Sequence, residues 1–507
     1  MKKSYTKTLM MIAVLLLAAL VLAACGGSND DEENENDDAA YEDGYPDGES
    51  DDGETERPIG GFIDLEGFGG MGLTPVNIDD RAPRGFVVNY PFTEEFWDAW
   101  ERRPMPTGSD LYFVQDFDYM IELLHDNFPF FAVAQRRFGV DVQALVWEAR
   151  NVLVEGHYII QSANDFWWVV WNYFTTPLQQ IGHFAIQSHA TLHLTLANVY
   201  RGGIGYDGNP LYLHGRDFSY WGEMFRDLLN SDLVWDMYGG FYIDLGNYEE
   251  GMIEPNNVTM EVLIDGEVAY IGVERFIHYN IEHDQELIFA FLREVSDFDH
   301  LIIDLRGNPG GFTRYFIQNF MMPIMYEAVE FSIYSMFVGG DRNLEWVGAH
   351  IADHYLWSGN ERLVWSAEDR MSVGFFPHMN TADLGILDYI SPHHVVIEPG
   401  DERLFYGKVW ILVDEASASA AEIAAMYARA ANFATIVGEP TRGVVGGGFV
   451  SFFSLPNTGL VVRHDIGYFI DEHGRAINEF GVIPGIRNSP DMDALETALA
   501  VIEIWGN

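Results

Sequence analysis

The chain has 507 residues, with 78 Asp and Glu against 28 Lys and Arg, and a formal net charge of −50 with neutral His. This charge excludes an ordinary nucleic-acid-binding protein and electrostatic docking on an anionic membrane surface, because both need clustered cations. Hydrophobic residues make up 48% of the chain, so it can bury a large core and is not disordered as a whole.

The first 25 residues have the pattern of a secretory signal. Three lysines precede an apolar run over residues 9–24, which is shorter than the ~20 residues that a membrane-spanning helix needs. The run ends in Leu22-Ala23-Ala24-Cys25, which resembles the lipobox of bacterial lipoproteins. We therefore expect a signal peptide over 1–24 and a lipid anchor on Cys25, at the extracytoplasmic face of the cell membrane. A plain signal peptide is the alternative.

An acidic segment follows the single cysteine of the chain. It holds 15 Asp and Glu between Asp30 and Glu56, with no Lys or Arg. Like charges repel one another and extend such a segment. We expect a disordered tether over 25–58 and an irregular lead-in over 59–105.

Hydrophobic periodicity divides the remaining chain into three parts. Residues 106–190 repeat apolar positions at three- and four-residue spacing and are predicted to form a helical N-terminal module, with helices at 117–124, 142–154 and 163–174. Residues 191–258 are a mixed stretch with several short strand-like runs and cannot be assigned a fold. Residues 259–507 alternate strands and helices, which predicts an α/β core. Its expected strands are 259–264, 268–273, 300–305, 408–413 and 434–438, and its expected helices 284–295, 316–325 and 419–431.

Three turn segments follow predicted buried strands: Asp304–Gly311, Asp414–Ile423 and Val437–Gly443. The glycines of the first let backbone N–H groups approach a ligand, although an ordinary turn would look the same. The second places serines at a helix N-terminus, where free N–H groups can hold an oxyanion. Its residues 419–422 also fit a helix capping box, which is the structural alternative.

In this order and spacing, the segments LIIDLRGNPGG, VDEASASAAEI and ATIVGEPTRG resemble the tail-specific, or C-terminal-processing, serine protease family and its tricorn-like relatives. The resemblance covers roughly residues 110–490. It implies a crotonase/ClpP-like α/β core with a helical N-terminal module, and a serine endopeptidase that acts on polypeptides. The carboxylate-binding loop of a PDZ domain is not evident in the segment 191–258.

The resemblance assigns roles to particular residues. The family nucleophile falls on Ser419, while Ser417 is the less favoured choice. The N–H of Ala420 would supply one oxyanion donor, and the N–H of Gly310 or Gly311 the other.

The composition excludes the family's usual base. The Lys of the Ser/Lys pair would fall on Val444, and Lys408, the only Lys in the mature chain, is expected to be a solvated charge at a strand end. The tricorn-like branch uses a His and a Glu instead. The His falls on His183, and histidine is the side chain that most often acts as a general base near neutral pH. The Glu falls on Asn478, and we favour its neighbour Glu479 as the orienting acid.

No cluster of metal ligands and no phosphate-binding loop occurs in the sequence, so no cofactor is expected. The predicted partners are a polypeptide substrate and the membrane through the lipid anchor, with no nucleic acid. Two alternatives stay open. One is an inactive binding or scaffold lipoprotein on the same fold, and the other is a solute- or polymer-binding lipoprotein. The oligomeric state cannot be predicted.

Overall fold

The structure is a computed structural model, which divides the chain into a unit over 1–61 and a unit over 62–507. It describes residues 91–105, 111–156, 160–178, 181–189, 191–192, 228, 231–238, 253–338, 340, 342–343, 365–366, 383, 386–387, 389–445, 450–471 and 473–505. The predicted signal, lipid-anchor site and tether lie outside the described residues, as does most of the segment 191–258.

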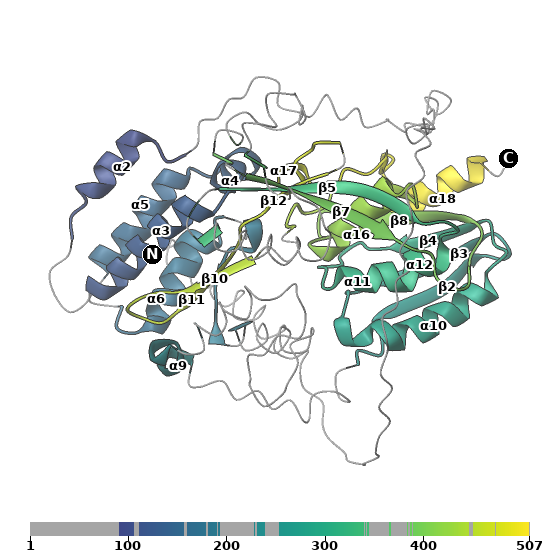
Figure 1. The fold of residues 1–507 in the computed structure, drawn as a ribbon, viewed down its shortest axis with the longest axis horizontal. Coiled ribbons are helices and arrows are strands. Elements are labelled where there is room, and N and C mark those ends of the chain that lie inside the picture. Colours follow the sequence, from purple (N-terminus) through teal and green to yellow (C-terminus); the bar gives the residue numbers. More distant parts are fainter. Residues whose placement is uncertain are drawn as a thin grey trace, which may run out of the picture. The chain divides into compact units, whose positions relative to one another are not determined.

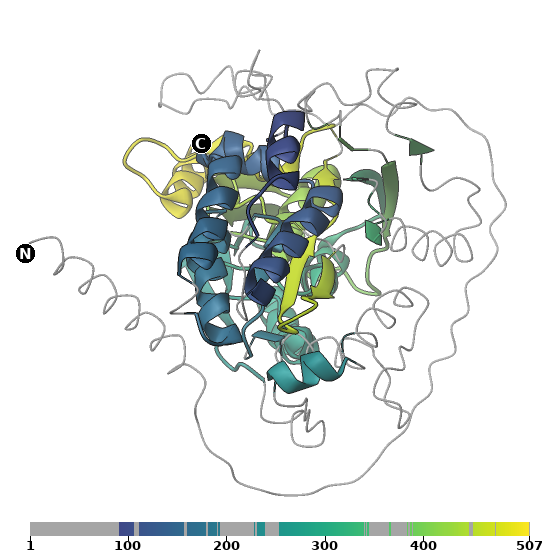
Figure 2. The ribbon, with the colours of Figure 1, turned by 90° about the vertical axis from the view of Figure 1, so that its left-hand side faces the viewer.

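The helical N-terminal region begins with an aromatic-rich bundle. Its helices are α2 (Glu94–Glu101), α3 (Leu111–Asn127), α4 (Phe131–Phe138), α5 (Val142–Glu155) and α6 (Ala163–Val170), followed by a π-helical turn at Trp171–Thr175. Thr93 and Asp141 cap α2 and α5, because their side-chain oxygens accept N–H groups of the first turn. The bundle core is built from fully buried rings, including Trp100, Phe117 and Phe131. Figure 2 views these helices, in blue, from their own side.

A six-stranded mixed sheet forms the centre of the α/β core. Its strands, in spatial order, are β13 (Ile486–Arg487), β9 (Thr435–Gly438), β8 (Lys408–Val413), β4 (His300–Asp304), β3 (Val268–Val273) and β2 (Val258–Ile264). All neighbours are parallel except β2, which is antiparallel to β3. The carboxyl ends of the parallel strands therefore lie along one edge, where ligands usually bind in such sheets.

Helices cover both faces of this sheet (Figure 1). On one face lie α10 (Ile281–Glu294), α11 (Thr313–Phe316), a π-helical turn (Ile317–Met321), α12 (Met322–Ile324) and α16 (Ala420–Ala430). On the other face lies α18 (Ala494–Trp505). Alternation along the strands explains the division: Ile303 and Ile411 pack with α16, whereas Ile302 and Trp410 pack with α18.

Two smaller sheets complete the described chain. One has the order β12 (Tyr468–Ile470), β5 (Val329–Phe337), β7 (Tyr389–Ile397) and β6 (Trp365–Ser366). The other has the order β1 (Ala185–Ile186), β11 (Val461–Asp465) and β10 (Val450–Ser454). Two short helices are α9 (Asp232–Tyr238), which precedes β2 in the chain, and α17 (Ile477–Phe480), which follows β12.

The β10–β11 hairpin is attached to helix α3 by one carboxylate. Asp116 is fully buried and accepts the backbone N–H groups of Asn457 and Thr458, both at 2.8 Å, and the Thr458 hydroxyl at 2.6 Å. Strand β1 pairs with the other edge of β11, with Ala185 opposite Arg463. The hairpin is thereby joined to the helical region along its turn and its outer strand.

These elements confirm the predicted fold class, an α/β core with a helical N-terminal module. The expected core strands and helices form within a few residues of their predicted ends. The two smaller sheets were not predicted; apart from the β10–β11 hairpin, their strands pair with residues far away in the sequence.

Candidate active site

Ser419 occupies a strained turn between strand β8 and helix α16. Its backbone has a φ of 56° and a ψ of −120°, a conformation that costs free energy for any residue other than glycine. A strained strand-to-helix turn of this kind presents the nucleophile in other hydrolases. Ser419 is half-buried and follows the carboxyl end of β8, at the edge where ligands usually bind.

The neighbouring Ser417 has a structural role. It is fully buried, its hydroxyl donates to the Leu305 carbonyl oxygen at 2.7 Å, and the same hydroxyl accepts the Asp414 N–H at 3.0 Å. These contacts join the turn after β8 to the end of β4. Ser417 is therefore committed to holding the turn, whereas Ser419 lies at its accessible end.

The glycine turn after β4 lies directly against the Ser419 turn. A Cβ atom on Gly310 would come within 2.6 Å of both the Ala418 carbonyl oxygen and the Ala420 nitrogen, so only glycine fits there. The N–H of Gly310 already donates to the Asn308 side chain at 2.8 Å. Among the described residues, the N–H groups of Gly311 and Ala420 donate no hydrogen bond.

Glu422 ties the Ser419 turn to the segment that carries the lysine in the tail-specific family. Its carboxylate is completely buried and accepts four hydrogen bonds: from the N–H of Ser419 (2.9 Å), the Thr441 hydroxyl (2.6 Å), and the N–H groups of Gly443 (2.5 Å) and Val444 (2.8 Å). Burial raises the pKa of Glu422, and the hydrogen bonds oppose that shift. The segment around Val444 therefore stabilises the Ser419 turn and does not supply a base.

Lys408 lies at the other end of the strand from Ser419. It is the first residue of β8 and is exposed, while Ser419 follows the carboxyl end of the same strand. The six residues of β8 separate the two positions, at about 3.3 Å per residue.

His183 follows a second strained turn, in the helical N-terminal region. Gly182 and His183 both have positive φ, at 56° and 46°. A Cβ on Gly182 would lie 2.4 Å from the Phe130 ring, so this turn also requires glycine. The His183 Nδ1 lies 2.6 Å from an Asp465 carboxylate oxygen, and the Asp465 side chain is fully buried. Asp465 thus fixes the imidazole and leaves Nε2 as the second ring nitrogen.

The residues expected to orient His183 have other partners, so the structure corrects this expectation. The Glu479 carboxylate accepts two hydrogen bonds from the Arg136 guanidinium, at 2.7 and 2.5 Å. The Asn478 side chain accepts the Phe469 N–H and donates to the Val445 carbonyl oxygen. The carboxylate in contact with His183 is that of Asp465, because β11 pairs with the strand that follows His183.

The Glu479 carboxylate belongs to a buried ionic cluster instead. Arg136 from α4 bridges Glu479 and Asp383, and the Tyr468 hydroxyl donates to Asp383 at 2.9 Å. Burial raises the pKa of Asp383 to about 6, and the nearby Arg136 charge opposes this shift. The cluster joins helix α4 to α17 and β12.

Helix α4 is the physical link between the two strained turns. Phe130, the residue before it, packs on Gly182, while Arg137 near its end lies against Gly443 and donates to the Asn478 carbonyl oxygen at 3.2 Å. Ser419 and His183 form no hydrogen bond with each other among the described residues. Hydrogen bonds between catalytic groups are often long without substrate and tighten in the complex.

Asp465 was missed from the sequence, although a local signal existed. The turn Pro456-Asn457-Thr458-Gly459 stands between two apolar runs, a pattern typical of a hairpin. Asp465 ends the second strand of that hairpin. The signal could have located the strand, but not its pairing with β1.

Residues 267–487 match the family model described as Peptidase family S41. The segment runs from the start of β3 to the end of β13 and contains both the glycine turn and the Ser419 turn. The match therefore supports an S41 peptidase domain in the α/β core and indicates a serine peptidase, which is a hydrolase. No curated protein matches the chain significantly.

Several solved structures are similar to the chain at low sequence identity. A putative peptidase from Parabacteroides merdae ATCC 43184 is 16% identical, with a TM-score of 0.44, and the alignment covers 77% of this chain and 96% of that one. Mature CPAF complexed with lactacystin is 14% identical, with a TM-score of 0.44 and coverage of 78% and 97%. A lipoprotein from Streptococcus agalactiae is 13% identical, with a TM-score of 0.37 and coverage of 79% and 98%.

The described residues contain no candidate for a membrane-spanning helix and no candidate for a metal site. No described helix is both long enough and apolar enough to cross a membrane. No group of three or more His, Cys, Asp or Glu within the described ranges is placed to hold a metal ion.

Proposed function

We propose that the protein is a serine endopeptidase that cleaves envelope or extracellular polypeptides through an acyl-enzyme, with Ser419, His183 and Asp465 as its catalytic residues. The observation that carries this proposal is the strained Ser419 turn packed against Gly310. The N–H groups of Ala420, in that turn, and of Gly311, the residue after Gly310, donate no hydrogen bond among the described residues. A turn with only a structural role would gain nothing from that strain.

The proposed reaction begins with attack of Ser419 Oγ on the scissile carbonyl carbon. His183 Nε2 takes the hydroxyl proton, and the Nδ1–H donates to Asp465, which stabilises the imidazolium. The tetrahedral oxyanion accepts hydrogen bonds from the N–H groups of Ala420 and Gly311. Gly311 is preferred to Gly310 because the Gly310 N–H already donates to Asn308.

The second half of the reaction releases the two products. His183 gives its proton to the leaving amine, and the carbonyl carbon remains as an ester on Ser419 Oγ. A water molecule then attacks this ester with His183 as the base, which frees the carboxylic acid and restores the serine.

A fluorophosphonate probe tests this proposal, because it forms a covalent bond only with an activated serine. We expect the intact protein to be labelled and the Ser419→Ala and His183→Ala variants to lose labelling. Ser296→Ala, in the turn after α10, serves as the matched control and should label normally. Absence of labelling in the intact protein at every pH from about 6 to 9, the range over which histidine bases act, would overturn the proposal.

The lipid anchor is a separate proposal that rests on the sequence Leu22-Ala23-Ala24-Cys25. We expect cells that express the full chain and are fed an alkyne fatty acid to produce a labelled protein on the extracytoplasmic face of the membrane. Cys25→Ser should abolish this labelling. Equal labelling of both proteins would contradict the anchor assignment.

A further inference from the structure

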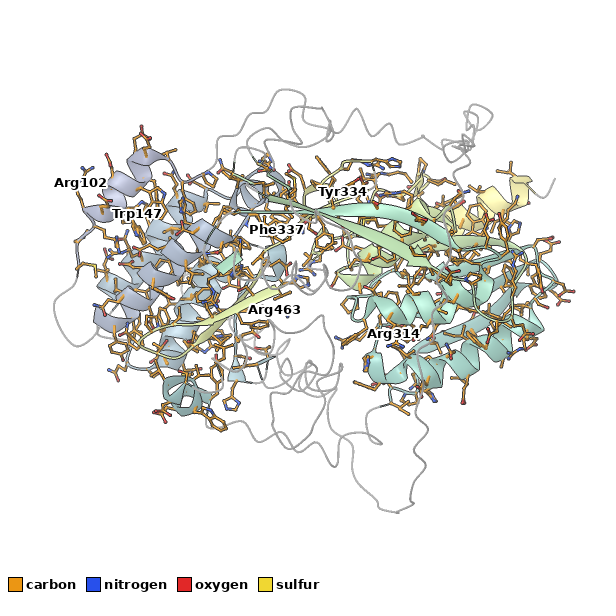
Figure 3. The ribbon with its side chains drawn as sticks, viewed as in Figure 1. Arg102, Trp147, Arg314, Tyr334, Phe337 and Arg463 are labelled. Carbon is orange, nitrogen blue, oxygen red and sulfur yellow. The ribbon has the colours of Figure 1, made fainter. Side chains whose placement is uncertain are left out.

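Arg463 lies on strand β11 of the small three-stranded sheet (Figure 3), two residues before Asp465, the partner of His183. Arg463 and Asp465 are two residues apart on one strand, so their side chains point to the same face, about 7 Å apart along the strand. Arg463 is also directly opposite Ala185, two residues after His183. Its guanidinium group is therefore within reach of whatever lies against the proposed base.

The opposite face of this strand packs against the rings of the helical region. His464 points there and contacts the rings of Phe128 and Phe453, in the core of the helical region. Arg463 projects from the other face of β11, the face that also carries Asp465. Its cross-strand neighbour on that face is Phe452, whose ring centre lies 6.0 Å from the guanidinium carbon.

The hydrogen-bonding capacity of Arg463 is unused among the described residues. Its side chain makes no hydrogen bond or ion pair there, and its Nε is buried without a partner. Burial lowers the pKa of Arg463, and the negative charge of Asp465 opposes this shift. Buried arginines elsewhere in this acidic chain do hold carboxylates, as Arg136 and Arg150 show.

Arg463 is half-buried, and a guanidinium whose Nε is buried without a partner is costly unless a ligand completes its hydrogen bonds. Its planar set of five N–H donors matches a carboxylate in geometry and charge. The long-range field of a chain with a net charge of −50 repels anions, so any such ligand must be held by short-range contacts.

We propose that Arg463 binds a carboxylate of the peptide substrate close to the scissile bond and so determines specificity. The inference rests on the proposed peptidase function. The carboxylate could belong to an Asp or Glu side chain or to the C-terminus of the peptide. In either case the bound peptide runs past His183 along the face of β11 that carries Arg463.

The experiment uses the full chain and begins with cleavage of a peptide library, read by mass spectrometry. We expect a carboxylate at a constant distance from the cut site. The selected sequence is then made as four quenched fluorescent peptides, with Glu or its Gln isostere at that position and with a free or amidated C-terminus. A loss confined to the Gln peptides identifies a side-chain carboxylate, and a loss confined to the amidated peptides identifies the chain terminus.

Variants then assign the preference to Arg463. Arg463→Gln should raise the KM for the preferred peptide by about 10- to 100-fold, the loss expected for a hydrogen-bonded charge, with kcat changed by less than about twofold. The KM for the neutral isostere should not change. Arg463→Lys should restore part of the preference, because it keeps the charge but not the planar donors. Arg293→Gln, which removes an exposed arginine paired with Glu402, is the matched control.

Two results would overturn the inference. One is a library profile without any carboxylate preference, and the other is an Arg463→Gln variant that slows acidic and neutral peptides equally, as a residue acting only through Asp465 would. Fluorophosphonate labelling of the same preparations keeps the two proposals separate. A labelled enzyme without the preference contradicts only the role of Arg463, whereas an unlabelled wild-type protein contradicts the peptidase itself.

Discussion

At the scale of single residues, the two strained turns and the buried acids beside them define the site. Ser419 and His183 both have positive φ, and each turn is completed by a glycine that no larger residue could replace. Each turn is also held by a fully buried carboxylate, Glu422 for the serine and Asp465 for the histidine. Conformational strain at both positions indicates that the surrounding contacts specify these geometries.

Asp465→Asn should show whether Asp465 or the predicted Glu479 orients His183. An amide in place of this carboxylate favours the wrong imidazole tautomer, so we expect kcat to fall by about 10³- to 10⁴-fold with little change in KM. Glu479→Gln should leave kcat within about tenfold, since its partner is Arg136 rather than His183. Steady-state hydrolysis of one peptide by both variants decides the assignment. The reverse order of losses would restore Glu479 as the orienting acid.

Glu422→Gln tests whether the buried acid holds the Ser419 turn. A glutamine amide offers only one acceptor atom, and its NH₂ group would face two donors that the carboxylate now satisfies. We expect a loss of about 2–4 kcal/mol in the free energy of unfolding, measured with urea, and slower labelling by the fluorophosphonate probe. An unchanged urea midpoint together with an unchanged labelling rate would show that Glu422 is dispensable.

At the scale of elements, the proposed base depends on a hairpin that is distant in sequence. β11 supplies Asp465, β1 follows His183, and the two strands pair across 278 residues from Ala185 to Arg463. Helix α3 fixes the hairpin turn through Asp116 (Figure 2 shows the helices in blue with the yellow-green hairpin beside them). The helical region therefore contributes His183 and holds the hairpin that contributes Asp465.

Asp116→Ala should release this hairpin without touching the proposed site. Four hydrogen bonds to Asn457 and Thr458 disappear, so we expect faster amide hydrogen exchange over 450–465 and a lower kcat. The buried strand β8 should keep its protection, which makes it the internal reference in the same mass-spectrometric experiment. Unchanged exchange in the hairpin would show that its strands hold it without the α3 anchor.

At the scale of the whole molecule, a single buried ionic cluster joins segments spread over most of the chain. Arg136, Asp383 and Glu479 come from three separate regions, and their side chains are almost completely buried. Arg136 is the only cation in contact with the two carboxylates among the described residues. The cluster also lies next to α17, which borders the segment held by Glu422.

Arg136→Met should destabilise the protein in a pH-dependent way. Removing the cation leaves two buried carboxylates uncompensated, at a cost of about 3–5 kcal/mol. The exposed Arg293→Met, with a partner that is also exposed, should cost less than about 1 kcal/mol. Protonation relieves the repulsion, so the cost of Arg136→Met should be larger at pH 8 than at pH 5. An equal cost at both values, from urea unfolding, would contradict the cluster as described.

The wild-type pH dependence has a definite sign. Because burial raises the pKa of Asp383 from 3.8 to about 6, the folded state binds this proton more tightly than the unfolded state does. The contribution of Asp383 to stability therefore decreases as the pH rises from about 4 to 6, and Asp383→Asn should remove this part of the slope.

The amino-acid sequence alone determined the α/β class, the core strands and the glycine turn, whereas Ser419 was singled out by its resemblance to a protease family. These features are local, because they follow from hydrophobic periodicity and from glycines that permit a single backbone geometry. The scarcity of lysine was by itself enough to exclude a Ser/Lys pair.

Only the tertiary structure decided which acid faces His183, which glycine N–H remains available, and where Arg463 points. Asp465 and His183 are 282 residues apart, and one strand pairing brings them together. Glu479 is close to the expected family position, but a neighbouring arginine occupies its carboxylate. Contacts of this kind depend on long-range register, in which a shift of one residue reverses every side chain, and no local pattern specifies that register.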